Sequence, residues 1–252
     1  MRMIARLPLI VMACLPVSGV TAPESDAAFV EVTLRAQGLL PGKNPPPEQG
    51  EWAYEIRGTA HRPKFEKTAC FAPEPRDLFE GKRFSFIADN RGEWGGELTV
   101  RQGKGRARTL IRENVIDMVP FNTTLYVFTG LDHGAMDHGA VYAIEDYDTK
   151  PRLRFITLLP GTPRAVSLDE SRGGLLVVTR LSLTVVRTSS DTIDVLMARH
   201  APLPEATSVM SVGRSEILIG ICGGVAQVHL PWHSRPPDPD YNIPIVTYWT
   251  AQ

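Results

Sequence analysis

The chain has few of the features that would reveal a function directly. It has only three cysteines in 252 residues, and its 27 basic and 28 acidic side chains almost cancel. The lack of net charge gives no reason to expect nucleic acid or an anionic membrane surface as a partner. No apolar run is long enough to cross a bilayer as a helix. The Gly-x-Ser-x-Gly nucleophile motif is also missing, as is a recognisable Cys–His arrangement, so we predict no nucleophilic enzyme.

The composition instead indicates an ordinary globular protein with many turns. Hydrophobic residues make up 43% of the chain and charged residues 22%, which is enough apolar material for a sizeable core. Glycine and proline occur 21 times each, above average usage. A chain so rich in turn residues is better suited to many short strands than to long helices.

The N-terminal segment has the pattern of an export signal. Arg2 and Arg6 precede an apolar run, and small residues end it at Ala22. We therefore predict that residues 1–22 are a signal peptide and that the protein is periplasmic or secreted. The sequence around Cys14 also resembles a bacterial lipobox, so lipidation of Cys14 and anchoring to the outer membrane is the alternative.

A strand pattern recurs from residue 83 onward. Four apolar strands begin at Phe84, Leu125, Leu175 and Ile217, about 40 to 50 residues apart. Each is followed by a turn and a partner strand, which begin at Gly96, Gly139, Ser182 and Gly224. A third strand follows in the first three units, and a preceding strand is present in units two to four, beginning at Val115, Ala165 and Ser208. Four short strands per unit at this period are typical of propeller blades.

We therefore predict an all-β fold, a β-propeller of four or five blades over residues 83–232, with a β-sandwich as the alternative. Residues 23–82 are expected to hold N-terminal strands and proline-rich loops, and residues 233–252 a tail with a closing strand. The N-terminal strands are expected at residues 29–34 and 52–58, which alternate apolar and polar residues. Strands from both chain ends would remove exposed sheet edges.

The remaining N-terminal stretches favour no regular structure. Three consecutive prolines predict a long loop over residues 38–50. Residues 61–78 are irregular, and the sequence places no element there.

One candidate ligand site is the loop after the first strand of unit one. Its side chains offer a bidentate donor, a carboxylate and a flat aromatic surface, which would suit a glycan or a protein partner. We predict that the contacting residues are Asp89, Asn90, Arg91, Glu93 and Trp94. The alternative is a structural hairpin with Trp94 packed on a neighbouring blade and Arg91 paired with Glu93.

A second candidate lies in the turn of unit two, in the sequence DHGAMDHG. Imidazole and thioether ligands are suited to copper or zinc. The predicted ligands are Asp132, His133, Met136 and His138. The alternative is a solvated hairpin loop over residues 131–140, in which aspartate and glycine serve turn geometry.

The turn-rich segments at residues 89–96, 127–133 and 159–163 resemble those of uncharacterised exported propeller-like proteins of Gram-negative bacteria. The resemblance covers about residues 83–232. It implies a propeller fold and a location in the cell envelope. It implies no activity and no functional residue.

Taken together, these features favour an exported, non-catalytic binding protein whose ligand is a protein or a glycan. One alternative is a metal-dependent hydrolase of the lactonase-like propeller type, in which dispersed aspartates meet at a central channel to hold a cation. Another is an inhibitor or immunity protein that presents residues 131–139 as a protruding loop.

Cys70 and Cys222 are the two cysteines that remain after the signal, and an isolated pair in an oxidising compartment is suited to a disulfide. We expect non-reducing mass spectrometry of the exported protein to find both cysteines oxidised and joined in one peptide pair. Two free thiols would show that the prediction is wrong.

Overall fold

The computed structural model describes residues 26–46, 51–70, 78–180, 182–198, 203, 205–213, 215–230 and 244–251. Within these residues the protein is all-β, apart from helix α1 (Asp26–Ala36) and the short 3-10 turn η1 (Gly92–Trp94). The predicted signal peptide and Cys14 lie outside them. In the part of the chain that is described, no helix is long and apolar enough to cross a membrane.

Four antiparallel sheets follow one another along the chain, each made of consecutive strands in simple order. The first sheet consists of β4 (Leu78–Glu80), β5 (Phe84–Asn90), β6 (Gly96–Gln102) and β7 (Arg108–Ile111). The second consists of β8 (Val115–Phe121), β9 (Thr124–His133), β10 (Met136–Glu145) and β11 (Arg152–Leu159). The third consists of β12 (Pro163–Asp169), β13 (Gly174–Thr179), β14 (Ser182–Arg187) and β15 (Ile193–Ala198). The fourth contains β16 (Ser208–Val212), β17 (Glu216–Ile221), β18 (Gly224–His229) and β19 (Ile245–Ala251).

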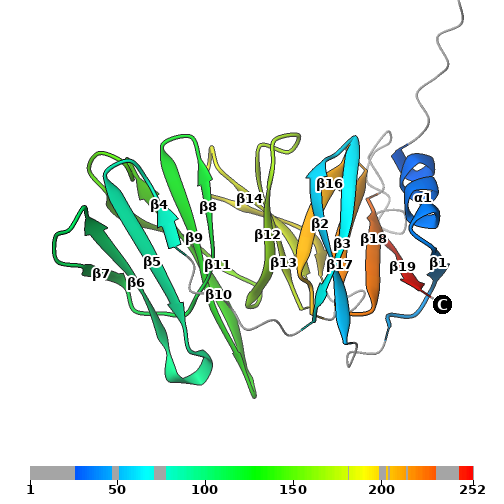
Figure 1. Cartoon of the computed structure of the whole chain (residues 1–252), viewed down its shortest axis with the longest axis horizontal. Helices are drawn as coiled ribbons and strands as arrows, with labels where there is room; N and C mark the ends of the chain where they lie inside the picture. The colour runs from blue at the N-terminus through cyan, green and yellow to red at the C-terminus, as the bar shows by residue number, and fades with distance from the viewer. Residues whose placement is uncertain are drawn as a thin grey trace, which may run out of the picture.

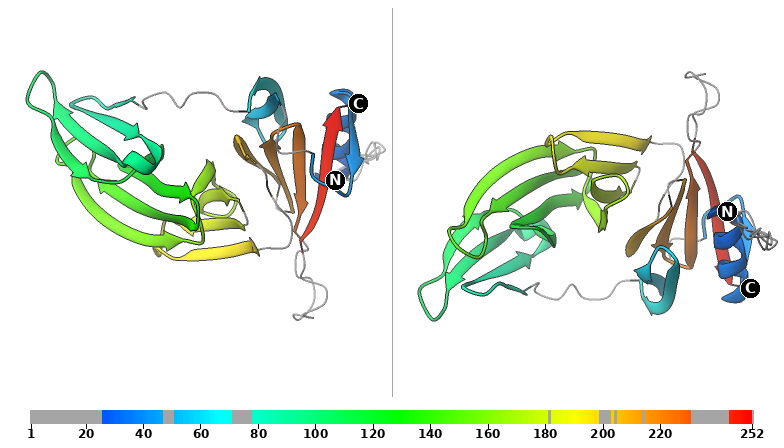
Figure 2. Two further views of the ribbon diagram at one scale, coloured as in Figure 1. Left: turned by 90° about the horizontal axis from the view of Figure 1, so that it is seen from below. Right: turned by 90° about the horizontal axis from the view of Figure 1, so that it is seen from above.

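The repeat predicted from the sequence is therefore confirmed at the level of strands and sheets. Among the described residues the sheets are small, none closes on itself, and they stand side by side in a curved row (Figures 1 and 2), which is consistent with propeller blades and with the alternative of a β-sandwich. The first sheet lies at one end of the row, and the fourth lies with α1 at the other.

The burial pattern along a strand reflects the position of its sheet in the row. In the third sheet, every residue of β13 is buried, because both faces pack against neighbouring sheets. In the first sheet, β6 alternates buried and half-buried positions, so only one face is covered. On the uncovered face β6 carries Glu97, whose carboxylate accepts a hydrogen bond of 3.0 Å from the Thr109 hydroxyl.

The hydrophobic core lies between consecutive sheets. Phe86 and Leu98 of the first sheet pack with Leu125 and Ile144 of the second. Other clusters fill the space between the second and third sheets and between the third and fourth. Each sheet thus depends on its neighbours to bury its apolar side chains.

Segments near both ends of the described chain join the fourth sheet. The strand predicted in the C-terminal tail is present as β19, which pairs with β18 but closes no ring among the described residues. Strand β1 (Leu39–Gly42) then pairs with β19 as a fifth strand, with Leu39 opposite Ala251. The prediction of an irregular loop over residues 38–50 was wrong for these four residues, because the missing N–H of Pro41 is tolerated on an edge strand.

The strand predicted at residues 29–34 is also wrong, because this segment is part of helix α1. Val30 and Leu34 are four residues apart and fully buried against the fourth sheet. Glu31 and Arg35 form an ion pair of 2.9 Å on the exposed side. The apolar residues of this short segment fit both the two-residue period of a strand and the 3.6-residue period of a helix. Packing against the fourth sheet favours the helix.

Strand β2 (Trp52–Thr59) confirms the predicted strand at residues 52–58, and it pairs with β3 (Arg62–Ala69). Neither β3 nor β4 was predicted from the sequence, because prolines interrupt this region. Pro63 is accommodated since β3 is the edge of a two-stranded sheet. The hairpin packs on the fourth sheet through Tyr54 and Ile56. As predicted, a disulfide joins Cys70 to Cys222, with Cα atoms 5.3 Å apart.

A buried ion pair lies between the third and fourth sheets. The Asp169 carboxylate accepts hydrogen bonds from the Arg172 guanidinium and from the Ser171 hydroxyl, the latter at 2.6 Å. Arg172 also donates to the Ser211 hydroxyl of β16. Burial by itself raises the pKa of Asp169, but these hydrogen bonds and the Arg172 charge outweigh it and hold the pKa below its usual value.

We expect Asp169→Asn to lower the free energy of unfolding at pH 7 by about 3 kcal/mol, because Arg172 would remain buried without its carboxylate. Since the pKa of Asp169 is lower in the folded state, its stabilising effect is present above the unfolded pKa of about 3.9 and is lost as pH falls through the folded value. Denaturant titrations from pH 7 to pH 2 would measure both effects. The exposed variant Glu31→Gln is the control and should change stability by less than about 1 kcal/mol.

Candidate functional site

The polar residues of interest lie at one rim of the row of sheets. In space, the end of the second strand of each of the first three sheets lies next to the start of the first strand of the following sheet. Asn90 ends β5, Asn114 directly precedes β8, Asp132 lies near the end of β9, Arg164 follows the first residue of β12, and Glu205 precedes β16. Residues from four successive sheets thus meet at this rim.

These residues line a cavity of about 520 Å³. Its side chains are mainly polar and include Asn90, Asn114, Asp132, Thr162, Arg164 and Glu205. A cavity of this volume is in the range that holds small ligands. The mixture of amide, hydroxyl, carboxylate and guanidinium groups can both donate and accept hydrogen bonds.

Arg164 connects three of the four sheets at this cavity. Its guanidinium forms an ion pair with Asp132 of the second sheet, and it lies 3.4 Å from the Glu205 carboxylate at the start of the fourth. Both carboxylates are thereby held in place, and each keeps lone pairs that can accept further hydrogen bonds.

The turn η1 stands beside the cavity and is held by Asn114. The Asn114 side chain accepts a hydrogen bond of 3.1 Å from the Arg91 backbone N–H and donates one of 2.7 Å to the Gly92 carbonyl oxygen. Gly92 and Gly95 adopt φ of 58° and 77°, a region that favours glycine. The turn is therefore built by glycine geometry and fixed by an amide from the next sheet.

Trp94 projects from this turn with 80% of its surface exposed. The alternative expectation, that Trp94 packs on a neighbouring blade, is wrong. The expected Arg91–Glu93 pair is replaced by other partners, since Arg91 lies 3.2 Å from Asp89 and Glu93 lies 3.1 Å from His133. A large aromatic ring held in solvent on a fixed turn offers an apolar face on which a ligand can stack.

The segment predicted as a loop over residues 131–140 is a continuation of two strands. The ladder between β9 and β10 extends to the pair His133–Met136, which leaves a two-residue turn. Gly139 permits this extension beside the third sheet, because a Cβ atom there would lie 2.6 Å from the Gly161 carbonyl oxygen. Cross-strand pairing thus shows two strands where the glycine-rich composition had suggested a loop.

Alternation along these strands separates the four predicted metal ligands. His133 and Met136 are directly opposite each other and share a face with His138. Asp132 points to the opposite face, where it pairs with Arg164. Across the described ranges, no three histidine, cysteine or acidic side chains are grouped so that they could hold a metal ion. The copper or zinc site stays a prediction, with at most His133, Met136 and His138 on a common face.

The second aspartate of this segment has a structural role. Asp137 accepts a hydrogen bond of 2.6 Å from the Thr162 backbone N–H, and the Thr162 hydroxyl donates to the His138 carbonyl oxygen at 3.1 Å. These bonds tie the hairpin to the turn that leads into β12. Asp137 therefore fixes the hairpin of the second sheet against the start of the third sheet at the rim.

Glu113 forms a smaller polar centre next to the turn. It accepts hydrogen bonds of 2.6 Å from the Thr129 hydroxyl and 2.8 Å from the Tyr142 hydroxyl. Burial, together with the bond to Glu113 and its charge, raises the pKa of Tyr142 to about 12. Tyr142 therefore remains a protonated donor at neutral pH.

The aspartates considered for a hydrolytic centre are mostly paired with arginine. The pairs are Asp89–Arg91, Asp132–Arg164, Asp146–Arg152 and Asp169–Arg172. They are distributed among different sheets, and each carboxylate has a structural partner.

Sequence reasoning identified the turn with Trp94 but missed Asn114, Arg164 and Glu205. Each precedes or begins the first strand of a sheet, so each occupies a similar place in the repeat. Aligning the residues just before these strands would have indicated a common rim. Their individual contacts depend on how adjacent sheets pack, which the alignment does not give.

No protein-family model matches this chain, and no curated protein matches it. Among solved structures, the chain is similar to the extracellular domain of a hybrid two-component system from B. thetaiotaomicron. The identity is 9% and the TM-score 0.42, and the match covers 84% of this chain and 38% of that one. The chain thus spans less than two fifths of that structure.

We expect Asn114→Ala to loosen the turn that carries Trp94, because two hydrogen bonds of its side chain would be lost. The free energy of unfolding should fall by about 2 kcal/mol. Amide hydrogen exchange at Arg91 should accelerate by about tenfold or more, while exchange in β13 should keep its order relative to global unfolding. Unchanged protection at Arg91 would contradict this role for Asn114.

Proposed function

We propose that this protein is an exported binding protein with an open β-propeller scaffold, and that it holds a saccharide at the rim beside Trp94. The exposed indole ring on a fixed turn is the observation that carries the proposal. Sugar rings present apolar faces that pack on an indole ring, while their hydroxyls require polar partners. The neighbouring cavity supplies those partners in Asn90, Asn114 and Arg164.

The charges at the cavity support a hydroxyl-rich ligand better than a simple ion. Arg164 is already shared between Asp132 and Glu205, so its charge is compensated. The remaining donors and acceptors can make several moderate hydrogen bonds to a neutral or weakly charged sugar. A small polar cavity is also less suited to a flat protein surface, which would bury a broad apolar patch.

The propeller assignment and the export are supported by independent features. Four consecutive four-stranded meanders have the strand order of propeller blades. The disulfide between Cys70 and Cys222 fits an oxidising compartment outside the cytoplasm. A scaffold of this kind presents its binding residues at strand ends, where rigid elements position them.

The proposal is tested with an array of soluble oligosaccharides, followed by calorimetry on the sugar that binds. We expect Trp94→Ala to weaken binding by about tenfold or more, because the stacking surface is removed. Trp94→Phe should retain most of the affinity. Ile245→Ala, at another exposed apolar position, is the matched control and should bind as the wild type does.

Equal affinity of the Trp94→Ala variant would overturn the assignment of the site. Lack of binding to every sugar on the array would overturn the ligand class. Near-ultraviolet circular dichroism of each variant would show that the fold is intact.

A further inference from the structure

The outer strand of the second sheet has an apolar face that nothing in the described chain covers. Strand β11 pairs with β10 on one side only, so it is the edge of its sheet. Leu153, Phe155 and Leu158 of this strand are 39%, 51% and 67% exposed. Three exposed large apolar residues within one edge strand are a recognised hazard for association.

These three side chains share one face of the sheet. Leu153 is opposite Ile144, and Phe155 is opposite Tyr142, with their rings 5.6 Å apart. The register shift after Phe155 places Leu158 opposite Ala140, on the same face again. We call Leu153, Phe155 and Leu158 the β11 stripe.

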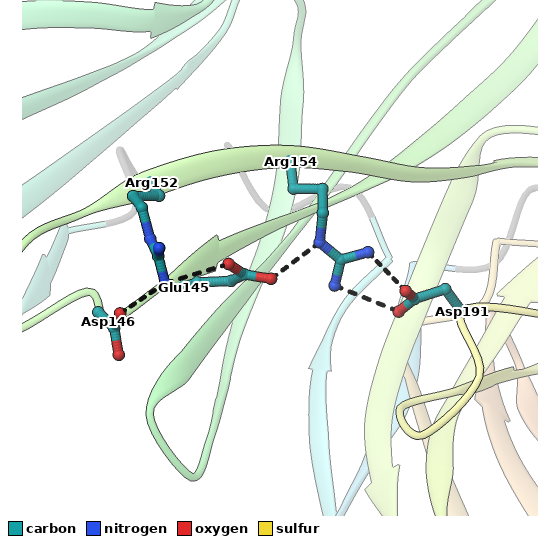
Figure 3. Close-up of polar contacts among 5 residues, drawn as sticks. All are labelled: Glu145, Asp146, Arg152, Arg154 and Asp191. Carbon is teal, nitrogen blue, oxygen red and sulfur yellow. Dashed lines mark hydrogen bonds and ion pairs between the residues drawn. The ribbon is translucent and has the colours of Figure 1, made fainter.

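Charged residues usually protect an edge strand, but here they are turned to the other face. Arg154 lies 2.8 Å from Glu145 and also pairs with Asp191 of the third sheet. Arg152 lies 2.8 Å from Asp146 (Figure 3). Because both guanidiniums are bound by carboxylates, neither is free to shield the β11 stripe.

The fourth sheet has an equivalent outer edge, and there the edge strand is paired. Its outer strand β19 is covered by β1, which adds antiparallel as a fifth strand. An outer edge of this scaffold can therefore accept a further strand. In the second sheet, no segment among the described residues takes that place.

We propose that β11 is the dimer interface of this protein, and that it pairs antiparallel with β11 of a second copy. A partner for this edge must offer an unpaired strand, an apolar stripe and compensated charges. The same edge of another copy meets all three requirements. An antiparallel pair of identical strands is also twofold symmetric, as closed dimers require.

Charge and register are compatible with this pairing. When two copies pair about Phe155, the two Phe155 rings are neighbours across the interface. Arg154 then lies opposite Ile156 of the second copy, and the register shift in β11 places Leu153 opposite Leu158 of the second copy, on the face of the β11 stripe. No arginine faces an arginine, so the like-charge penalty of opposed edge residues is avoided.

The interface is small, since it consists of one strand and its stripe from each copy, so we expect a dimer of micromolar affinity. Sedimentation equilibrium of the full exported chain should show a concentration-dependent dimer. Phe155→Lys should raise the dissociation constant by about tenfold or more, because a charge would enter the stripe. Val32→Lys, at an exposed apolar position on α1, is the matched control and should dimerise normally.

Cross-linking tests the register independently. In the predicted pair the two Cβ atoms of residue 155 lie about 5 Å apart, so Phe155→Cys should form a covalent dimer under mild oxidation, whereas Val32→Cys should not. Circular dichroism checks that each variant folds. A monomer throughout the accessible concentration range would overturn the proposal and leave the edge to a strand of another protein. A dimer that survives Phe155→Lys unchanged would overturn it equally.

Discussion

The structure depends on the burial of each sheet between its neighbours. A single four-stranded meander of this chain has too little apolar surface of its own to form a core, so the clusters of buried side chains all lie between elements. The outer faces of the first and fourth sheets, at the two ends of the row, have no neighbouring four-stranded sheet among the described residues to cover them. The outer face of the first sheet is left partly exposed, while the fourth sheet is covered by α1 and the β2–β3 hairpin, and the Cys70–Cys222 disulfide fastens that hairpin.

The same stacking creates the rim at which we propose that a ligand binds. Because consecutive sheets stand side by side, the turns and strand ends of different units meet, and side chains far apart in the sequence become neighbours. Arg164 shows the effect, since it bridges Asp132 and Glu205 from two other sheets. Asn114 does the same for the turn that carries Trp94. The proposed binding residues are therefore fixed by the packing that stabilises the fold, while the indole ring of Trp94 extends into solvent.

Much of the fold could be predicted, because strands buried on both faces leave a strong apolar signal. The runs at Leu175 and Ile217 were recognised as strands for this reason, and their spacing gave the repeat. Strands with weak signals were missed or misassigned. Strand β3 has mostly exposed or half-buried residues and a proline, and the segment at residues 29–34 fitted both a strand and a helix. The hairpin at His133–Met136 looked like a loop, since its composition suggested turns and only the ladder with its partner shows otherwise.

The sequence by itself determined the all-β class of the fold, the four strand units that begin after residue 83 and the cysteine pair, because these follow from local apolar patterns and from simple counting. It also marked the turn around Trp94 as a concentration of binding side chains. Only the tertiary structure decided which of those side chains are free. Trp94 is left in solvent, and Asp132 is turned toward Arg164 and away from His133. The arginines of the β11 edge form ion pairs with Glu145, Asp146 and Asp191. The physical reason is that partner choice depends on distances between units, and these distances arise only when the sheets pack.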